Sequence, residues 1–274
     1  MRFVWIQAFA GALLLTAAGC SATQTGSGPA QPPLSQPPLS SSEAPSASPS
    51  SPETPTAESS ASPSATVRVD PAAKVIYLTF DDGPWVPYTQ QMLRVLKDND
   101  AIATFFVVGE MVQEHPDLVP KIVAAGHAIG NHTWSHPQLP TLTDSQIKEE
   151  LRSTAEVVGP AMGPCMRPPY GATNERVRAI TKSMGYHTYL WTDWAVDWEQ
   201  PPVAELVESL RNATKDKANI LLHDGGGDRP NTVEAVAIMI PRWKKQGYTF
   251  EALPRCLNEI TDPTPAPSQL QPVP

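Results

Sequence analysis

Short apolar runs that alternate with helical patterns are the feature of this sequence that most constrains its fold. Six runs have the length and the β-branched or aromatic content of strands, and a seventh is weakened by prolines. The six are residues 74–80, 103–109, 127–131, 186–192, 218–224 and 248–254, and the seventh is 165–170. Strands that alternate with helices form a parallel sheet with helices packed outside it. Seven such units predict an α/β barrel or near-barrel.

The helices between these runs are marked by end signals and by apolar spacing. Thr143 and Gln146 match a capping box that opens one helix, and Asn174 is a suitable cap for the next. Apolar residues at helical spacing over 203–210 and 233–243 predict two more helices.

The first 20 residues have the organisation of a bacterial export signal. A basic start, Met1-Arg2, precedes an apolar stretch too short to favour a membrane-spanning helix. The small residues before Cys20 resemble a lipobox, where cleavage leaves that cysteine as a lipidated N-terminus. We therefore expect an extracytoplasmic lipoprotein anchored to the cell membrane. The alternative is an ordinary secretory signal, an incidental cysteine and a secreted protein.

Two segments of biased composition flank the folded part. Residues 21–66 are rich in Ser and Pro and contain no aromatic residue, Lys or Arg, so they predict a disordered tether. Residues 258–274 predict a disordered tail. The remaining 67–257 is the length of one catalytic domain. Its remaining cysteines, Cys165 and Cys256, either form a disulfide or are two small buried hydrophobic residues, and their spacing does not decide between these.

Partners are constrained by charge. The net charge of −8 argues against nucleic acid and says little about a neutral sugar. No segment indicates a protein partner.

Polar residues gather where the predicted strands end. They are Asp81, Asp82, Arg167, Asp193, His223 and Asp224. In barrels of parallel strands the chemistry collects at the C-terminal strand ends, so these side chains predict the position of a site.

Two histidines beside an aspartate pair predict a metal site. His132 and His136 are four residues apart, and on a helical turn both imidazoles would reach one ion. Two imidazoles and one carboxylate suit a catalytic divalent metal, and the second carboxylate of Asp81-Asp82 is then free to act as a base. Taken singly, a surface histidine pair and an Asp-Asp-Gly turn are the commoner explanations.

The last polar strand end carries an imidazole next to an apolar side chain. Leu221 and His223 are two residues apart on a predicted strand and so share a face. They suggest a small apolar slot beside a proton donor, whereas a core histidine is the ordinary alternative.

Five short motifs occur in an order that resembles a known enzyme family. TFDDGP, HTWSH, RPPYG, the pair Asp197-Trp198 and LLHDG are similar to the motifs of the polysaccharide deacetylases, carbohydrate esterase family 4, whose fold is called the NodB homology domain. The resemblance covers about residues 70–255. It implies a distorted (β/α) barrel of about seven parallel strands and a metal-dependent removal of acetyl groups from a sugar.

Roles follow from the resemblance for the metal and the base. Asp82, His132 and His136 would bind the metal, commonly zinc or cobalt. Asp81 would be the general base, and Arg167 would orient it.

The other matched positions would bind substrate and supply the acid. Tyr170 would hold the oxyanion through its backbone N–H. Leu221 and Trp198 would line a pocket for the acetyl methyl group. His223 would be the general acid, tuned by Asp197.

The fourth motif departs from the family pattern W-x-x-D-x-x-D-W. Asp197 and Trp198 match, but the first aspartate is displaced by one residue to Asp193, and Trp194 stands in its usual place. A shift of one residue on a strand reverses the face. Asp193 is therefore not assigned the role of that aspartate, which leaves the support of Arg167 open.

These observations favour a deacetylase of N-acetylated cell-wall polysaccharide, with the N-acetylglucosamine of peptidoglycan as substrate. A chitooligosaccharide deacetylase or an acetyl xylan esterase is the alternative within the same chemistry. A non-catalytic glycan-binding lipoprotein is the alternative of another class, and it would be expected to lack a base or a metal ligand. Every matched motif position is filled.

Overall fold

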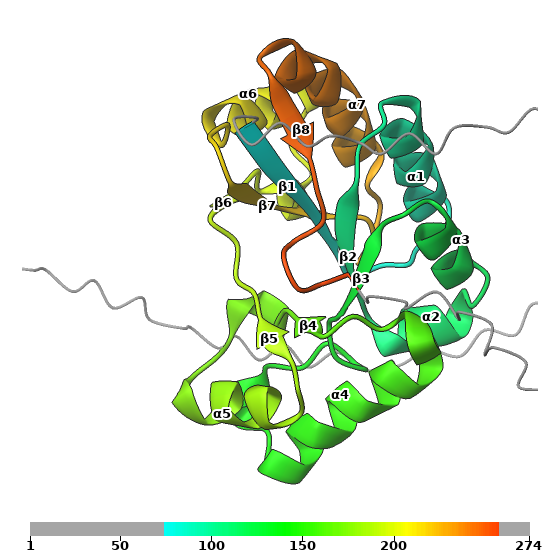
Figure 1. Cartoon of the computed structure of the whole chain (residues 1–274), viewed down its shortest axis with the longest axis vertical. Coiled ribbons are helices and arrows are strands. Elements are labelled where there is room, and N and C mark those ends of the chain that lie inside the picture. The colour runs from blue at the N-terminus through cyan, green and yellow to red at the C-terminus, as the bar shows by residue number, and fades with distance from the viewer. Residues whose placement is uncertain (1–73, 258–274) are drawn as a thin grey trace, which may run out of the picture. The chain divides into compact units, whose positions relative to one another are not determined.

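A curled sheet of parallel strands carries the fold of residues 74–257, the part of the chain that the computed structural model describes (Figure 1). The strands are β1 Lys74–Asp81, β2 Ala103–Val107, β3 Ala128–Asn131, β4 Cys165–Met166, β5 His187–Thr188, β6 Asp193–Trp194, β7 Ala218–His223 and β8 Tyr248–Phe250. Their order is β5-β4-β3-β2-β1-β7-β6, and β8 pairs with the start of β1. Seven parallel strands in one path form an open half-barrel, which confirms the predicted fold class.

Within residues 74–257, seven α-helices connect the strands and pack outside the sheet (Figure 1). They are α1 Tyr88–Asp98, α2 Gly109–Glu114, α3 Leu118–Ala124, α4 Asp144–Val158, α5 Glu175–Ser183, α6 Val203–Asn212 and α7 Pro230–Lys245. The capping box of Thr143 and Gln146 opens α4 as predicted, and the Asn174 side chain accepts from the N–H of Val177 at the start of α5.

Three predicted strands are much shorter than the sequence indicated, and of these the run 165–170 contains only β4. The run 186–192 contains only β5, and the chain then crosses to β6 on the opposite edge of the sheet. The run 248–254 is a strand only as far as Phe250. An apolar run does not reveal where pairing stops, because the partner strands decide it.

The two faces of the sheet are buried in different ways. Alternate residues of β1, namely Ile76, Leu78 and Phe80, face the helices and are fully buried in the main core. The opposite, inner face is partly filled by residues 251–257, which fold back after β8 (Figure 1).

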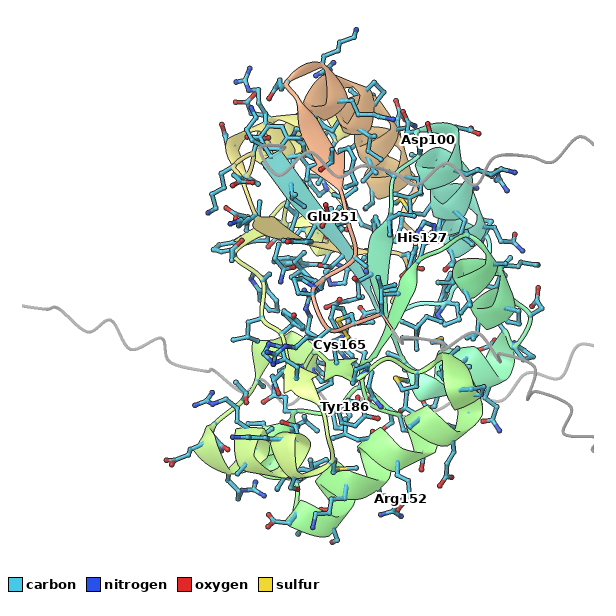
Figure 2. The ribbon with its side chains drawn as sticks, viewed as in Figure 1. Asp100, His127, Arg152, Cys165, Tyr186 and Glu251 are labelled. Atoms are coloured by element: carbon cyan, nitrogen blue, oxygen red, sulfur yellow. A yellow bond between two sulfur atoms is a disulfide. The ribbon has the colours of Figure 1, made fainter. Side chains whose placement is uncertain are left out.

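A hydrogen bond and a disulfide help to fix this returning segment to the inner face. The N–H of Leu253 donates to Oγ1 of Thr104 at 2.9 Å. Cys165 and Cys256 form a disulfide with their Cα atoms 5.1 Å apart, which decides the alternative that spacing left open (Figure 2).

No helix among residues 74–257 is long and apolar enough to cross a membrane. The predicted signal, Cys20, the tether and the tail lie outside the described residues.

Candidate active site

The inner face of the half-barrel carries the polar residues at its C-terminal end. β1 and β7 run in register with Thr79 opposite Leu221 and Asp81 opposite His223. Paired residues of neighbouring strands project to the same face, and this face is the one away from the helical core. The strand-end location expected from the sequence is therefore observed.

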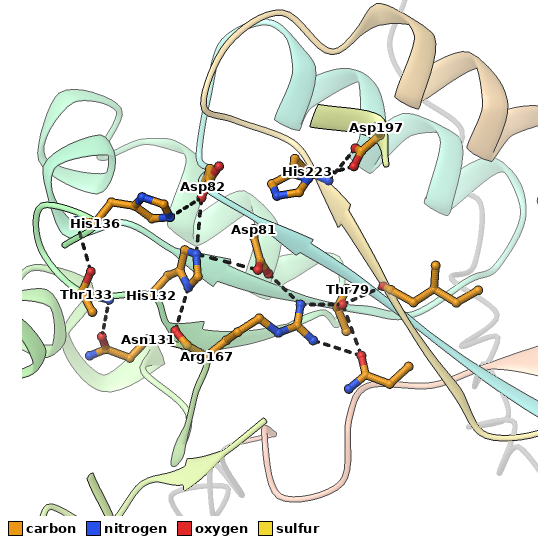
Figure 3. A network of polar contacts seen from close by, with 12 residues as sticks. Thr79, Asp81, Asp82, Asn131, His132, Thr133, His136, Arg167, Asp197 and His223 are labelled. Carbon is orange, nitrogen blue, oxygen red and sulfur yellow. Dashed lines mark hydrogen bonds and ion pairs between the residues drawn. The ribbon is translucent and has the colours of Figure 1, made fainter. Parts of the chain in front are cut away.

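Asp82, His132 and His136 bring three ligand atoms together on one side of Asp81 (Figure 3). Oδ1 of Asp82 lies 3.1 Å from Nε2 of His136 and 3.3 Å from Nε2 of His132. That oxygen is buried and receives no hydrogen bond from residues 74–257. Burial alone would raise the pKa of Asp82, but the two imidazoles hold it well below its ordinary value.

The protonation of His132 makes this cluster suitable for a cation. Its Nδ1 lies 2.7 Å from the carbonyl oxygen of Arg167, which can only accept, so Nδ1 carries a proton. Burial would lower the pKa of His132, but the charges of Asp81 and Asp82 raise it above its ordinary value. A bound cation would displace the proton of Nε2 and take its lone pair, which points toward the Asp82 carboxylate. Converging lone pairs on nitrogen and oxygen match the donor set of a divalent transition metal, and a backbone carbonyl that orients the ligating imidazole is a usual support. The residues fit the implied metal.

The loop that carries the two histidines is not the helical turn that their spacing suggested. Thr133 and His136 both have left-handed backbones, with φ of 71° and 59°. Glu150 of α4 holds the loop, because its carboxylate accepts from the N–H groups of Trp134 and Ser135 at 2.8 and 2.9 Å. The prediction of convergence was right, and the reason given for it was wrong.

Asp81 is fixed by a buried guanidinium. Nη1 of Arg167 donates to Oδ1 of Asp81 at 2.8 Å, and Arg167 is fully buried. Burial lowers the pKa of Arg167, whereas the adjacent Asp81 opposes that shift. Because the other oxygen of Asp81 lies 3.7 Å from Nε2 of His132, the carboxylate stands between the arginine and the metal cluster.

His223 and Asp197 form a pair on the other side of Asp81 (Figure 3). Asp197 opens the 3₁₀ turn Asp197–Glu199, and its Oδ1 lies 2.8 Å from Nδ1 of His223. Its Oδ2 accepts from the backbone N–H of His223 at 2.9 Å and from Oγ1 of Thr232 at 3.0 Å. Burial would lower the pKa of His223, but the hydrogen bond and the negative charge of Asp197 raise it to about 9.

Aromatic side chains form the rim of the site. The Tyr170 ring packs on His136 with centroids 4.6 Å apart, and Tyr170 is 64% exposed. The ring of Trp198 meets that of His223 edge-on at 5.8 Å and is also exposed. Leu221 is buried beside His223 on the inner face. The predicted residues therefore lie around one centre, while the oxyanion and pocket roles stay predictions.

The displaced fourth motif puts Asp193 outside the site. Asp193 pairs with Ile220, whose side chain is in the helical core, and its carboxylate binds Lys215 at 2.9 Å. Trp194 pairs with Leu221 and so takes the inner face, where it is 52% exposed. The expectation that Asp193 belongs to the strand-end cluster is wrong.

Asp224 lies close to the site but faces away from it. It is buried, accepts from Oγ1 of Thr89 at 2.6 Å, and desolvation raises its pKa to about 7. A Cβ on Gly83 would come within 2.4 Å of its carboxylate, so Asp224 sits directly under the Asp-Asp-Gly turn. Its position indicates support of that turn.

Two residues at the base of the site were not predicted from the sequence. Oγ1 of Thr79 and Oδ1 of Asn219 lie 2.8 and 3.0 Å from the guanidinium of Arg167. Each occupies an ordinary strand position, and only the inward alternation from Asp81 and His223 could have indicated it.

Comparison with known proteins places these residues in a family context. The family model described as polysaccharide deacetylase matches residues 68–189. A peptidoglycan-N-acetylglucosamine deacetylase from Bacillus cereus is 40% identical over 185 residues, which cover 65% of this chain and 85% of that protein. A chitooligosaccharide deacetylase from Rhizobium leguminosarum bv. trifolii is 35% identical over 194 residues, covering 66% and 90%.

A solved structure gives the same result in three dimensions. The structure of a peptidoglycan deacetylase from Bacillus subtilis superposes with a TM-score of 0.63 at 33% identity, covering 68% of this chain and 90% of that one.

Proposed function

Because the chain belongs to the polysaccharide deacetylase family, we propose that it hydrolyses the acetamido group of N-acetylglucosamine in peptidoglycan. As a member of this family it is a metal-dependent hydrolase that removes acetyl groups from N-acetylated glycans. The observation that carries the proposal is the position of Asp81, between the Asp82 cluster on one side and His223 with Asp197 on the other (Figure 3). This arrangement suits attack and departure at one carbonyl carbon.

The chain's own residues account for the proton transfers. Asp81, held by Arg167, takes a proton from the water that attacks the acetyl carbon. His223 gives its proton to the sugar nitrogen as the carbon–nitrogen bond breaks, which releases acetate and a free amine. The backbone N–H of Tyr170 stabilises the charge on the carbonyl oxygen in the transition state.

The metal belongs to the Asp82 side. Asp82, His132 and His136 would hold it, and we propose zinc or cobalt from the mixed nitrogen and oxygen donors. When bound, the ion supplies a Lewis acid for the carbonyl and makes water more acidic.

Peptidoglycan is favoured over other acetylated glycans by two observations. One relative, which this chain matches over 85% of the relative's length, is named for the deacetylation of peptidoglycan N-acetylglucosamine. The lipobox-like sequence before Cys20 would hold the domain next to the cell wall, as a lipoprotein of the cell membrane. Chitooligosaccharide is the second candidate, since a relative of similar coverage is named for it.

Acetate release is the measurement that tests the function. The purified domain with zinc or cobalt is expected to release acetate from peptidoglycan faster than from chitin oligomers or acetylated xylan. Release from xylan alone would contradict the proposed substrate. No release from any of the three by metal-loaded protein would favour the non-catalytic glycan-binding alternative.

The anchor has a separate test. Replacing Cys20 with Ser is expected to move the protein from the membrane fraction to the medium. An unmodified mature N-terminus at another residue, found by mass spectrometry, would contradict the lipoprotein.

A further inference from the structure

The guanidinium of Arg167 is held by three oxygens, of which only one belongs to a carboxylate among the described residues. Nη1 donates to Asp81 and to Oγ1 of Thr79, both at 2.8 Å. Nη2 donates to Oδ1 of Asn219 at 3.0 Å. We propose that Asn219 is a positioning residue that fixes this guanidinium and, through it, the base Asp81. The inference rests on the proposed deacetylase function.

Asn219 is itself held in one orientation. Its Nδ2 donates to the carbonyl oxygen of Leu190 at 2.8 Å, and its backbone N–H donates to Oγ1 of Thr192 at 2.9 Å. Because a carbonyl oxygen only accepts, the amide nitrogen must face Leu190, and Oδ1 therefore faces Arg167. Asn219 is buried, so this orientation is not shared with bulk water. The side chain thus links Leu190 to the arginine, while the contact with Thr192 holds only the backbone of Asn219.

Asn219 is the one hydrogen-bond acceptor for Nη2 of Arg167 among residues 74–257. The Phe106 ring lies 4.3 Å from Cζ and holds the plane by stacking. Thr79 and Asp81 share one nitrogen, Nη1. The Nε atom is buried and has no hydrogen-bond partner within 74–257. Without Asn219, Nη2 would join Nε as a second buried donor with no acceptor, so the guanidinium would shift toward another acceptor and its bond to Asp81 would change direction.

The neutral amide also keeps the charge of Arg167 for the base. The aspartate that the displaced motif provides, Asp193, is bound to Lys215 outside the site. Asn219 satisfies Nη2 without adding a second negative charge. Asp81 is then the only carboxylate among the described residues that is hydrogen-bonded to the guanidinium.

A double-mutant cycle tests whether Asn219 acts through Arg167. Asn219→Leu removes the acceptor at similar volume, and it is expected to lower kcat about 10-fold or more with KM nearly unchanged, because a hydrogen bond to a charged group is lost. In an Arg167→Met background the same change is expected to lower kcat less than about 2-fold.

Thr192→Val is the matched control. It removes the hydroxyl that accepts from the backbone of Asn219 and leaves Oδ1 facing Arg167. It is expected to keep kcat. If Asn219→Leu does not fold, Asn219→Ser serves, because its shorter side chain leaves Nη2 without this acceptor.

Three outcomes would overturn the inference. They are full kcat in the Asn219 variants of an active enzyme, an equal loss in Thr192→Val, or an undiminished loss in the Arg167→Met background. The unfolding free energies of the wild type, Asn219→Leu, Arg167→Met and the double variant distinguish a failure of this inference from a failure of the proposed function. Coupling between Asn219 and Arg167 in stability, with a wild type that releases no acetate, would contradict the deacetylase and with it the catalytic meaning of the contact.

Discussion

The two sides of Asp81 differ in how completely the protein satisfies them. Asp197 is satisfied by the chain, since its oxygens are bonded to the ring nitrogen and the backbone N–H of His223 and to Thr232. On the other side, Oδ1 of Asp82 is buried without a hydrogen bond from residues 74–257, and two imidazole nitrogens face it. On the side of His223 and Asp197, which we call the acid side, the folded chain supplies every hydrogen-bond partner of the Asp197 carboxylate. On the side of Asp82, a cation is needed to balance the lone pairs of the carboxylate and the imidazoles.

The two sides of Asp81 also differ in backbone conformation, which is regular on the side of His223 and irregular on the side of Asp82. His223 ends the regular strand β7, and the sheet fixes it. Asp82 and His136 have left-handed backbones, with φ of 72° and 59°, in loops that close contacts from elsewhere hold in place. Residues in this region of φ persist where the surroundings determine them. The comparison teaches that His223 depends on the sheet for its position, while Asp82 and His136 depend on loop contacts.

Loss of the ligand set is expected to have the largest effect. The double variant His132→Ala, His136→Ala should lose more than about 10³-fold in kcat, because the Lewis acid is lost from the transition state. Its metal content, measured by mass spectrometry of the native protein, should fall below one ion per chain. Wild-type activity of this variant in excess chelator would contradict the need for a cation.

Loss of the base or of the acid separates the two sides. Asp81→Asn and His223→Ala are each expected to lower kcat about 10²- to 10⁴-fold, the usual range for a positioned proton-transfer group. His223→Ala should keep its metal, because His223 does not belong to the cluster of Asp82, His132 and His136. If His223→Ala lost its metal together with its activity, the two sides would not be separate.

The pH profile sharpens the comparison further. His223 must be protonated to act as acid, and Asp197 is the main cause of its pKa of about 9. Since a bound cation offsets Asp81 and Asp82, the alkaline limb of kcat in the loaded enzyme is expected at or below about pH 9. In Asp197→Asn the imidazolium loses its anionic partner, so the limb should move to lower pH.

Thr232→Val is the control for this shift. It removes a hydrogen bond from Asp197 and keeps the negative charge beside His223. The limb should move much less than in Asp197→Asn. An unmoved limb in Asp197→Asn would show that the charge of Asp197 does not set the protonation of the acid.

Local signals in the sequence predicted much of the fold and the site residues that lie in the five motifs. β1, α4 with its capping box, and the residues of the five motifs depend on neighbours within a few positions, which a single sequence displays. The pairing of Cys165 with Cys256 could not be predicted in this way, because it depends on the return of residues 251–257 into the half-barrel.

Contacts over long sequence separation account for the errors in the site. The HTWSH loop, with its left-handed residues, is held by hydrogen bonds to Glu150, which lies on the following helix. Asn219 meets Arg167 across 52 residues. Neither contact leaves a periodic or compositional mark, so the support of Arg167, which the displaced fourth motif left open, could not be assigned from the sequence.

The smallest expected effect concerns the aromatic rim on the acid side. Trp194 is exposed beside Leu221, and Trp198 is exposed against His223. An exposed indole offers a flat apolar surface to a sugar ring, worth about 0.5–1.5 kcal/mol if it resembles other aromatic contacts. Trp194→Ala should therefore raise KM about 2- to 10-fold with little change in kcat, and Trp194→Phe should keep most of the wild-type KM.

Trp198→Ala should lower kcat as well, because it removes the ring that contacts the acid His223. Equal effects of the two tryptophans on kcat would place Trp194 in the reaction centre and not on the rim, whereas an unchanged KM in Trp194→Ala would mean that glycan does not bind along this edge of the acid side.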